Sequence, residues 1–271
     1  MTRRFVRRLL GSIYFFVLLG LVLGGVISVI FVPKPTVAEI TLSGVILEQA
    51  DVDTIIDELQ SSKANRNIKA VVLNIDSPGG AVSAIEPIYF EILELKKSKP
   101  VVAAVRTVAA SGGYYIAVAT NFIYAQPNAT VGSVGVIGAL PVSEELDEYV
   151  ITTGPFKRIG QSRRRAISEI ETIRQQFVEA VTIQRGGKLK ISEGELSQAS
   201  TYSGTQSLEY GLIDDIGTST LAMQKAAELA GIKNYGTTEC LIQCTEEVDL
   251  EDLKSRTNNI PIYYYLYFEL E

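Results

Sequence analysis

The segment AASGGYY at residues 109–115 holds the side chain best placed for covalent chemistry, the hydroxyl of Ser111. Two alanines and two glycines surround this serine, so a substrate backbone could approach it closely. An apolar run ending in a predicted loop at 106–107 precedes the segment, and residues 116–119 suit the first turns of a buried helix. Because free N–H groups at a helix start stabilise a developing oxyanion, the pattern favours a nucleophile, although a serine that only caps the helix would look the same.

The chain contains no histidine, which excludes a Ser-His-Asp triad. A nucleophilic Ser111 would therefore need another base, for which lysine is the known substitute. Lys157 is the single lysine between Lys99 and Lys188, and strand-like alternation in residues 154–160 would let its side chain point inward. A free lysine has a pKa of about 10.4, so a catalytic lysine must be buried enough to lose its proton near neutral pH. An ordinary surface lysine is the alternative interpretation.

The segment SPGG at residues 77–80 stands where a predicted strand hands over to a helix, the usual position of a ligand loop in alternating α/β folds. Its glycines leave backbone N–H groups exposed. One of these, with the N–H of Ser111, would make an oxyanion hole with two donors. A simple tight turn is the alternative interpretation.

The stretch 129–138 has glycines at 132, 135 and 138 among β-branched residues. A glycine-rich extended stretch suggests that another backbone lies alongside it, and an extended peptide substrate could do so by adding a strand. Ser133 is the polar side chain inside this stretch, and a buried hydroxyl needs a partner. A lysine ammonium would serve as that partner.

Strands and helices are predicted to alternate, which indicates a parallel sheet or superhelix with helices on its flanks. The expected strands are 37–42, 69–75, 100–105 and 121–125. The expected helices are 51–59, which Asp51 would cap, 83–96, 143–150 and 218–230. A capping box at Ser83 opens the second of these, and two more capping boxes, at Ser168 and Ser192, predict further helices. The arginines at 163–165 are expected in an exposed loop.

Four segments in this order, 77–80, 109–115, 131–137 and 210–217, resemble the signal peptide peptidase A family of membrane-bound serine proteases. The resemblance implies an α/β fold shared with Clp protease and crotonase, a superhelix of repeated β-β-α units. It also implies one catalytic domain per chain, assembly into a homo-oligomeric ring, and hydrolysis of remnant signal peptides and other apolar peptides without metal or cofactor.

The same resemblance implies a role for each candidate residue. Ser111 corresponds to the nucleophile and Lys157 to the general base of a Ser-Lys dyad. Ser133 corresponds to the serine that positions the lysine. The backbone N–H of Gly80, rather than that of Gly79, corresponds to the oxyanion-hole donor of the SPGG loop.

The first residues predict a membrane anchor. Four arginines precede an uncharged run from 9 to 32, which is long enough to span a bilayer. Arginines on this side place the start of the chain in the cytoplasm and the remainder on the extracytoplasmic side of the cell membrane. A cleaved signal peptide is the alternative, but the run is longer than usual and lacks a small-residue cleavage site. The expected division is 1–36 for the anchor, 37–232 for the protease domain and 233–271 for an extension.

The extension ends in an aromatic tail at 260–268, which could form an added edge strand, contact a neighbouring subunit or the membrane, or resemble substrate and reach the active-site groove. Cys240 and Cys244 are expected to be packing residues, too far apart on a strand to form a disulfide. With 31 acidic against 25 basic residues, nucleic acid is not an expected partner. Two rival functions remain: a ring-forming membrane protein without catalysis, and an acyl-thioester enzyme of the crotonase type.

Overall fold

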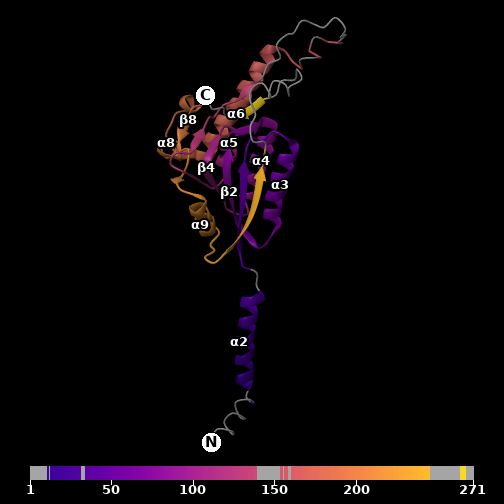
Figure 1. Cartoon of the computed structure of the whole chain (residues 1–271), viewed down its shortest axis with the longest axis vertical. Coiled ribbons are helices and arrows are strands. Elements are labelled where there is room, and N and C mark those ends of the chain that lie inside the picture. Colours follow the sequence, from indigo (N-terminus) through magenta and orange to yellow (C-terminus); the bar gives the residue numbers. More distant parts are fainter. Residues whose placement is uncertain are drawn as a thin grey trace. The chain divides into compact units, whose positions relative to one another are not determined.

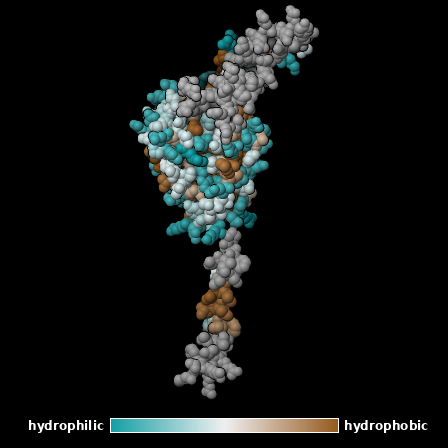
Figure 2. Space-filling view, in the orientation of Figure 1, coloured by the Kyte–Doolittle hydropathy of each residue, from teal (hydrophilic) through white to brown (hydrophobic). Residues whose placement is uncertain are grey.

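The computed structural model describes residues 11, 13–31, 34–138, 153–154, 156–157, 160–244 and 263–266. The chain divides into two compact units, Met1–Pro35 and Thr36–Glu271. The first contains helix α2 (Ile13–Phe31), which has exposed apolar side chains, Phe16 and Leu21 among them. Figure 2 shows hydrophobic surface, in brown, at the place of this helix in Figure 1. Among the described residues, no helix has both the length and the hydropathy required to cross a membrane.

The second unit is built on an eight-stranded sheet, in which six strands run in the order β10-β1-β2-β4-β5-β9, β6 pairs with β4, and β8 pairs with β6. Strands β2, β4 and β8 of this sheet are labelled in Figure 1. All pairs are parallel except β6 with β8. The predicted parallel sheet is therefore confirmed. Its strands are β1 (Thr36–Ser43), β2 (Ile68–Ser77), β4 (Val101–Ala110), β5 (Phe122–Ala125), β6 (Thr130–Gly132), β8 (Thr201–Ser203), β9 (Asp215–Ile216) and β10 (Gly236–Gln243).

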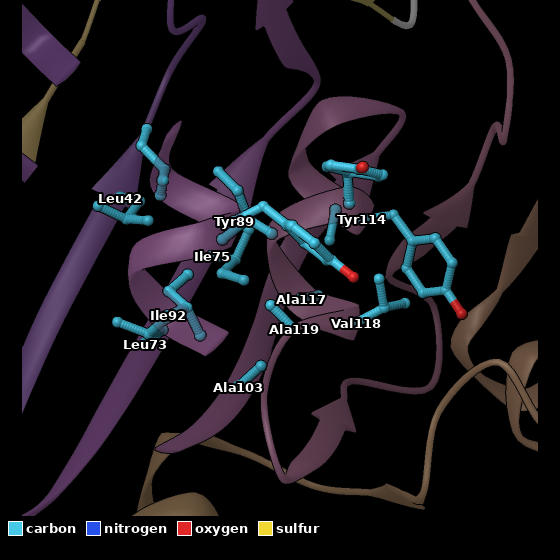
Figure 3. Packing of buried hydrophobic residues seen from close by; sticks show 14 of the residues in the cluster. Leu42, Leu73, Ile75, Tyr89, Ile92, Ala103, Tyr114, Ala117, Val118 and Ala119 are labelled. Carbon is cyan, nitrogen blue, oxygen red and sulfur yellow. The ribbon is translucent and has the colours of Figure 1, made fainter. Parts of the chain in front are cut away.

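Helices cover both faces of this sheet, and alternate strand residues pack on each side because side chains alternate along a strand. Val71 and Leu73 belong to the larger core cluster, whereas Ala70 and Val72 of the same strand pack with α9. Figure 3 shows Leu73 and Ile75 of β2 beside Ile92 of α4 in the larger cluster. The helices are α3 (Gln49–Ala64), α4 (Val82–Leu95), α5 (Gly112–Val118), α6 (Arg163–Arg185), η1 (Gly186–Lys188), α7 (Glu193–Leu196), α8 (Gly204–Glu209) and α9 (Ser219–Leu229).

Several predicted boundaries are wrong. The loop expected at 106–107 does not exist, because β4 continues through these residues to Ala110. Asp51 lies in the first turn of α3, whose N-cap is Glu48, and α4 begins without a side-chain cap. These two helices begin earlier than expected because packing of their apolar faces, rather than a cap, sets where they start.

Helix α6 also begins earlier than its predicted capping box at Ser168. The Ser162 side chain accepts a hydrogen bond of 3.3 Å from the N–H of Arg165, so the three exposed arginines form the first helical turn rather than a loop. The capping box at Ser192 is confirmed, and α9 follows Thr218 as expected. The helix predicted at 143–150 lies outside the described residues.

Strand β10 joins the main sheet beside β1, although the sequence pattern assigned it to an extension beyond residue 232. Cys240 lies on β10 and Cys244 directly after it, and both thiols are free, as predicted. A second sheet contains three short strands in the order β3 (Gly79–Ala81), β11 (Tyr263–Leu266) and β7 (Ile137–Gly138). It therefore joins three segments that are far apart in the sequence.

Candidate active site

Ser111 occupies the junction between strand β4 and helix α5 in a conformation that serine rarely adopts. Its backbone angles are φ 49° and ψ −117°, and the residue is 1% exposed. A positive φ outside glycine costs about 1–3 kcal/mol and persists only when the surroundings enforce it, often at functional sites. Ser111 thus lies at the start of a helix, as the sequence predicted, and its backbone is held in a strained conformation that the sequence did not predict.

The glycine-rich residues 132–135 contact this serine through two of their carbonyl groups. The Ser111 N–H donates a hydrogen bond of 2.8 Å to the Gly132 carbonyl, and the Ser111 hydroxyl lies 3.4 Å from the Gly135 carbonyl, within hydrogen-bonding distance. The Ser111 N–H expected in the oxyanion hole is therefore already occupied in this conformation. A hydrogen bond of 2.9 Å from the Ser133 N–H to the Ser200 carbonyl helps to hold residues 132–135, and Ser133 itself has a strained φ of 53°.

Helix α5 is fixed against strand β2 by a close backbone contact. A Cβ atom added to Gly113 would stand 2.3 Å from the Ser77 carbonyl oxygen, so only glycine allows this approach. On its other sides, Tyr114 donates its hydroxyl to the Leu212 carbonyl at 2.8 Å. The ring of Tyr115 packs against those of Tyr89 and Phe177, with centroids 4.4 and 4.8 Å away. These contacts hold the first turn of α5, and with it Ser111.

The SPGG segment turns away from β2 and becomes the short strand β3. The Ser77 hydroxyl donates to the Gly44 carbonyl at 2.6 Å and accepts from the Gly79 N–H at 3.2 Å, which fixes the turn. On one edge of β3, the Ile46 N–H donates to the Gly79 carbonyl and the Ala81 N–H to the Ile46 carbonyl, both at 3.0 Å. Because successive residues of a strand present their N–H groups to opposite edges, the Gly80 N–H points to the other edge.

That other edge is occupied by strand β11. Tyr265 pairs with Gly80, and Tyr264 pairs with both Ala81 of β3 and Ile137 of β7, all in antiparallel orientation. Strand β11, the short yellow arrow in Figure 1, also contacts α4 and α5. The edges of β3 and β7 therefore form a site that accepts one extended strand next to the helix that begins after Ser111.

Lys157 does not lie where the sequence pattern placed it. Its side chain is exposed, and residues 156–157 form a turn in which the Lys157 N–H donates to the Gly154 carbonyl at 3.2 Å. The predicted strand-like alternation is wrong here, because the described residues of this segment form a turn and bends, with Gly160 at a φ of 74° that a strand does not contain. Among the residues that the structure describes, no hydrogen bond joins Lys157 to Ser111 or to Ser133.

A buried ion pair that the sequence pattern did not reveal lies between α6 and the segment 210–217. Arg185 of α6 donates to both oxygens of Asp214 at 2.9 and 3.1 Å, and both side chains are 4% exposed. Asp214 also accepts from the Ile123 N–H at 2.8 Å, and Arg185 donates to the Gly211 carbonyl at 2.7 Å. Arg185 resembles any basic residue at a helix end. Asp214 belongs to the segment 210–217 and could have been singled out there.

The pKa of the Asp214 carboxyl reflects two opposing influences. Burial raises this pKa. The hydrogen bonds and charge of Arg185, together with hydrogen bonds from Lys188 and the Ile123 N–H, lower it by more than burial raises it. The result is a pKa below the ordinary value for aspartate. Asp214 is therefore held as a carboxylate that joins α6 to β5 and to the segment that accepts the Tyr114 hydroxyl.

The described site combines features that nucleophilic attack on an extended peptide requires. It offers a hydroxyl on a strained backbone and a sheet edge that pairs with a strand. It also offers one predicted oxyanion donor, the Gly80 N–H, that faces this strand. Among the predicted side chains, Lys157 is exposed, whereas Ser111 and Ser133 are buried.

Comparisons with known proteins point to one class. A model described as Peptidase family S49 matches residues 94–233, and a model described as Clp protease matches residues 36–131. Protease 4 of Salmonella typhi is 29% identical over 221 residues, which are 74% of this chain and 35% of that protein. The chloroplastic serine protease SPPA of Arabidopsis thaliana is 30% identical over 205 residues, which are 70% of this chain and 29% of that protein. The chain thus spans about a third of the length of these relatives.

A solved structure has the same architecture. The 1510-N membrane-bound stomatin-specific protease superposes with a TM-score of 0.52 at 17% sequence identity, over 76% of this chain and 98% of that one. At this identity the likeness concerns the fold alone. Together with the Clp protease match, it supports the Clp-like α/β fold that the motifs implied.

Proposed function

This chain belongs to peptidase family S49, and on that premise we propose that it is a serine endopeptidase with Ser111 as its nucleophile. One observation carries the proposal: the strained Ser111 begins the helix that contacts a strand paired between β3 and β7. A peptide in that position is extended, as a protease substrate must be, and its backbone lies along the Gly80 N–H.

The reaction needs a base, for which we propose Lys157. The neutral amine takes the proton from the Ser111 hydroxyl, whose oxygen attacks the peptide carbonyl carbon and forms a tetrahedral intermediate. The C–N bond then breaks, Lys157 returns the proton to the leaving amine, and water hydrolyses the acyl-enzyme. Because Lys157 is exposed in the structure, this role requires the turn at 156–157 to close onto Ser111. Closure would bury the amine and so favour its neutral form.

The Gly80 N–H is the proposed oxyanion donor, because it points to the edge along which the peptide lies. The Ser111 N–H can contribute only after it gives up its hydrogen bond to the Gly132 carbonyl. Ser133 is proposed to hold the Lys157 amine after the turn closes. It is buried and lies one residue beyond Gly132.

The proposed substrates are apolar peptides, including remnant signal peptides, and the proposed location is the membrane. The exposed apolar side chains of α2 and the uncharged run from 9 to 32 after four arginines support an anchor with the protease domain outside the cytoplasm. Extraction of membranes at alkaline pH tests the proposed anchor, because an anchored chain stays in the membrane fraction. The proposed homo-oligomeric ring is tested by the mass of the detergent-solubilised particle.

The test of catalysis uses the solubilised full chain, a fluorogenic apolar peptide and a reagent that labels active-site serines. Ser111→Ala should abolish both hydrolysis and labelling, and Lys157→Ala should abolish hydrolysis. Lys69→Ala, a change at another exposed lysine, should leave hydrolysis intact. Retained hydrolysis in Lys157→Ala would remove Lys157 as the base. No hydrolysis and no labelling in the unmodified chain would favour a protein without catalysis, and thioester turnover unaffected by Ser111→Ala would favour a crotonase-type enzyme.

A further inference from the structure

The strand that occupies the proposed substrate site belongs to this chain itself. β11 comprises Tyr263–Leu266 and lies between β3 and β7, antiparallel to both. Leu266 pairs with Gly79, and Tyr263 pairs with Gly138. The four residues thus bridge the two glycine-rich segments that the sequence singled out for substrate binding.

The backbone geometry shows that β11 uses the edge proposed for substrate. The Ile46 segment occupies one edge of β3, so the N–H and carbonyl of Gly80 are left to face Tyr265. Tyr264 and Ile137 form the corresponding pair on the other side of β11. Each strand edge can pair with only one partner strand at a time. A peptide can therefore enter between β3 and β7 only when β11 leaves.

We propose that Tyr263–Leu266 is an intramolecular inhibitor of the peptidase, which competes with substrate for the edges of β3 and β7. This inference rests on the proposed function. Its segment, Tyr-Tyr-Tyr-Leu, is uncharged and rich in residues that favour strands. It therefore has the chemistry of an extended apolar peptide, the class of substrate proposed for this site.

Covalent connection makes this inhibitor effective even if its intrinsic affinity is weak. Residues 245–262 connect β11 to β10, and a tethered segment competes at an effective concentration on the order of millimolar. A peptide present at low concentration, or one that pairs poorly with β3 and β7, is excluded. A peptide that binds tightly displaces the strand, so β11 sets a threshold for which peptides reach Ser111.

Proline substitution tests the inference in the full chain. Successive N–H groups of β11 point to opposite neighbours, so the double variant Tyr264→Pro/Tyr265→Pro removes one donor toward β7 and one toward β3. We expect kcat/KM for an apolar peptide to rise about tenfold, because two backbone hydrogen bonds of the inhibited state are lost. The control Asn258→Pro adds a proline but leaves all four paired residues unchanged, and it should keep the rate of the unmodified chain. Equal rates in the unmodified chain and the double variant would overturn the inference while leaving the proposed function standing.

A binding measurement separates the two proposals when no hydrolysis is found. Both the full chain and its double proline variant carry Ser111→Ala, and the probe is a fluorescent synthetic peptide with the sequence of residues 260–268. We expect the peptide to bind the double variant at least about tenfold more tightly than the chain with an intact β11. Equal affinities would overturn the inference whether or not the protein proves to be a peptidase. Binding to the double variant alone would support it even if catalysis were absent.

Discussion

Ser111 and Gly132 are joined by a backbone hydrogen bond of 2.8 Å from the Ser111 N–H to the Gly132 carbonyl. Both residues have positive φ, 49° for Ser111 and 110° for Gly132. The bond therefore links two unusual backbone conformations, one at the end of β4 and one at the end of β6. Because β4 and β6 are neighbours in the sheet, this bond continues their pairing up to the serine.

The strain at Ser111 predicts an unusual order of stabilities. Ser111→Gly should be more stable than Ser111→Ala by about 1 kcal/mol. Glycine relieves about 1–3 kcal/mol of backbone strain, and its greater freedom in the unfolded chain offsets about 0.4–1 kcal/mol. Urea unfolding of both variants measures the difference. The matched pair at Ser83, an exposed serine inside α4, should show the reverse order. An alanine variant more stable than the glycine variant at position 111, as expected at position 83, would mean that Ser111 is unstrained.

The contact between α5 and β2 predicts that Gly113→Ala is costly. The new methyl group would meet the Ser77 carbonyl oxygen at 2.3 Å, so α5 and β2 must separate. We expect a loss of about 1–3 kcal/mol in the free energy of unfolding and a fall in peptide hydrolysis, because Ser111 moves with the helix. Gly187→Ala is the control, since nothing lies within 4 Å of its added Cβ. Similar unfolding free energies for the two variants would contradict this account of the contact.

The ion pair behind the site predicts a large difference between two substitutions of basic residues. Arg185→Met leaves the Asp214 carboxylate buried without its main partner and should lower the free energy of unfolding by about 3–5 kcal/mol. Lys188→Met removes a partner whose side chain is 57% exposed and should cost about 1 kcal/mol or less. Denaturant titration of both variants provides the measurement. Equal losses would show that the buried pair contributes no more than the exposed one.

The lowered pKa of Asp214 predicts how stability changes in acid. A carboxyl group whose pKa is lower in the folded than in the unfolded protein stabilises the fold at pH values above the unfolded pKa. This contribution is lost as the pH falls through the folded pKa. The unfolding free energy of the unmodified chain should thus fall below about pH 4. The difference between it and Asp214→Asn should shrink over the same range. A difference that stayed constant down to pH 2 would exclude Asp214 as the titrating group.

Much of the fold could be predicted because its signals are local. The β-branched runs of β2 and β4 are buried on both faces, so they read as continuous apolar segments typical of parallel strands. Helix starts were harder to predict. The capping box at Ser192 forms, but Ser83 lies inside α4, where the packing of the apolar face sets where the helix begins. A cap contributes about 1 kcal/mol, which packing easily exceeds.

By itself the sequence determined the chemistry that is available: a serine between small residues, no histidine, and glycine-rich segments in a recognisable order. It did so because these features depend on residue type and short spacing. Only the tertiary structure decided that Ser111 is strained, that Arg185 pairs with Asp214, that Lys157 lies in an exposed turn, and that β11 fills the edge beside Gly80. Each of these depends on contacts between segments distant in the chain, which no local pattern encodes, because they form only when the whole core packs.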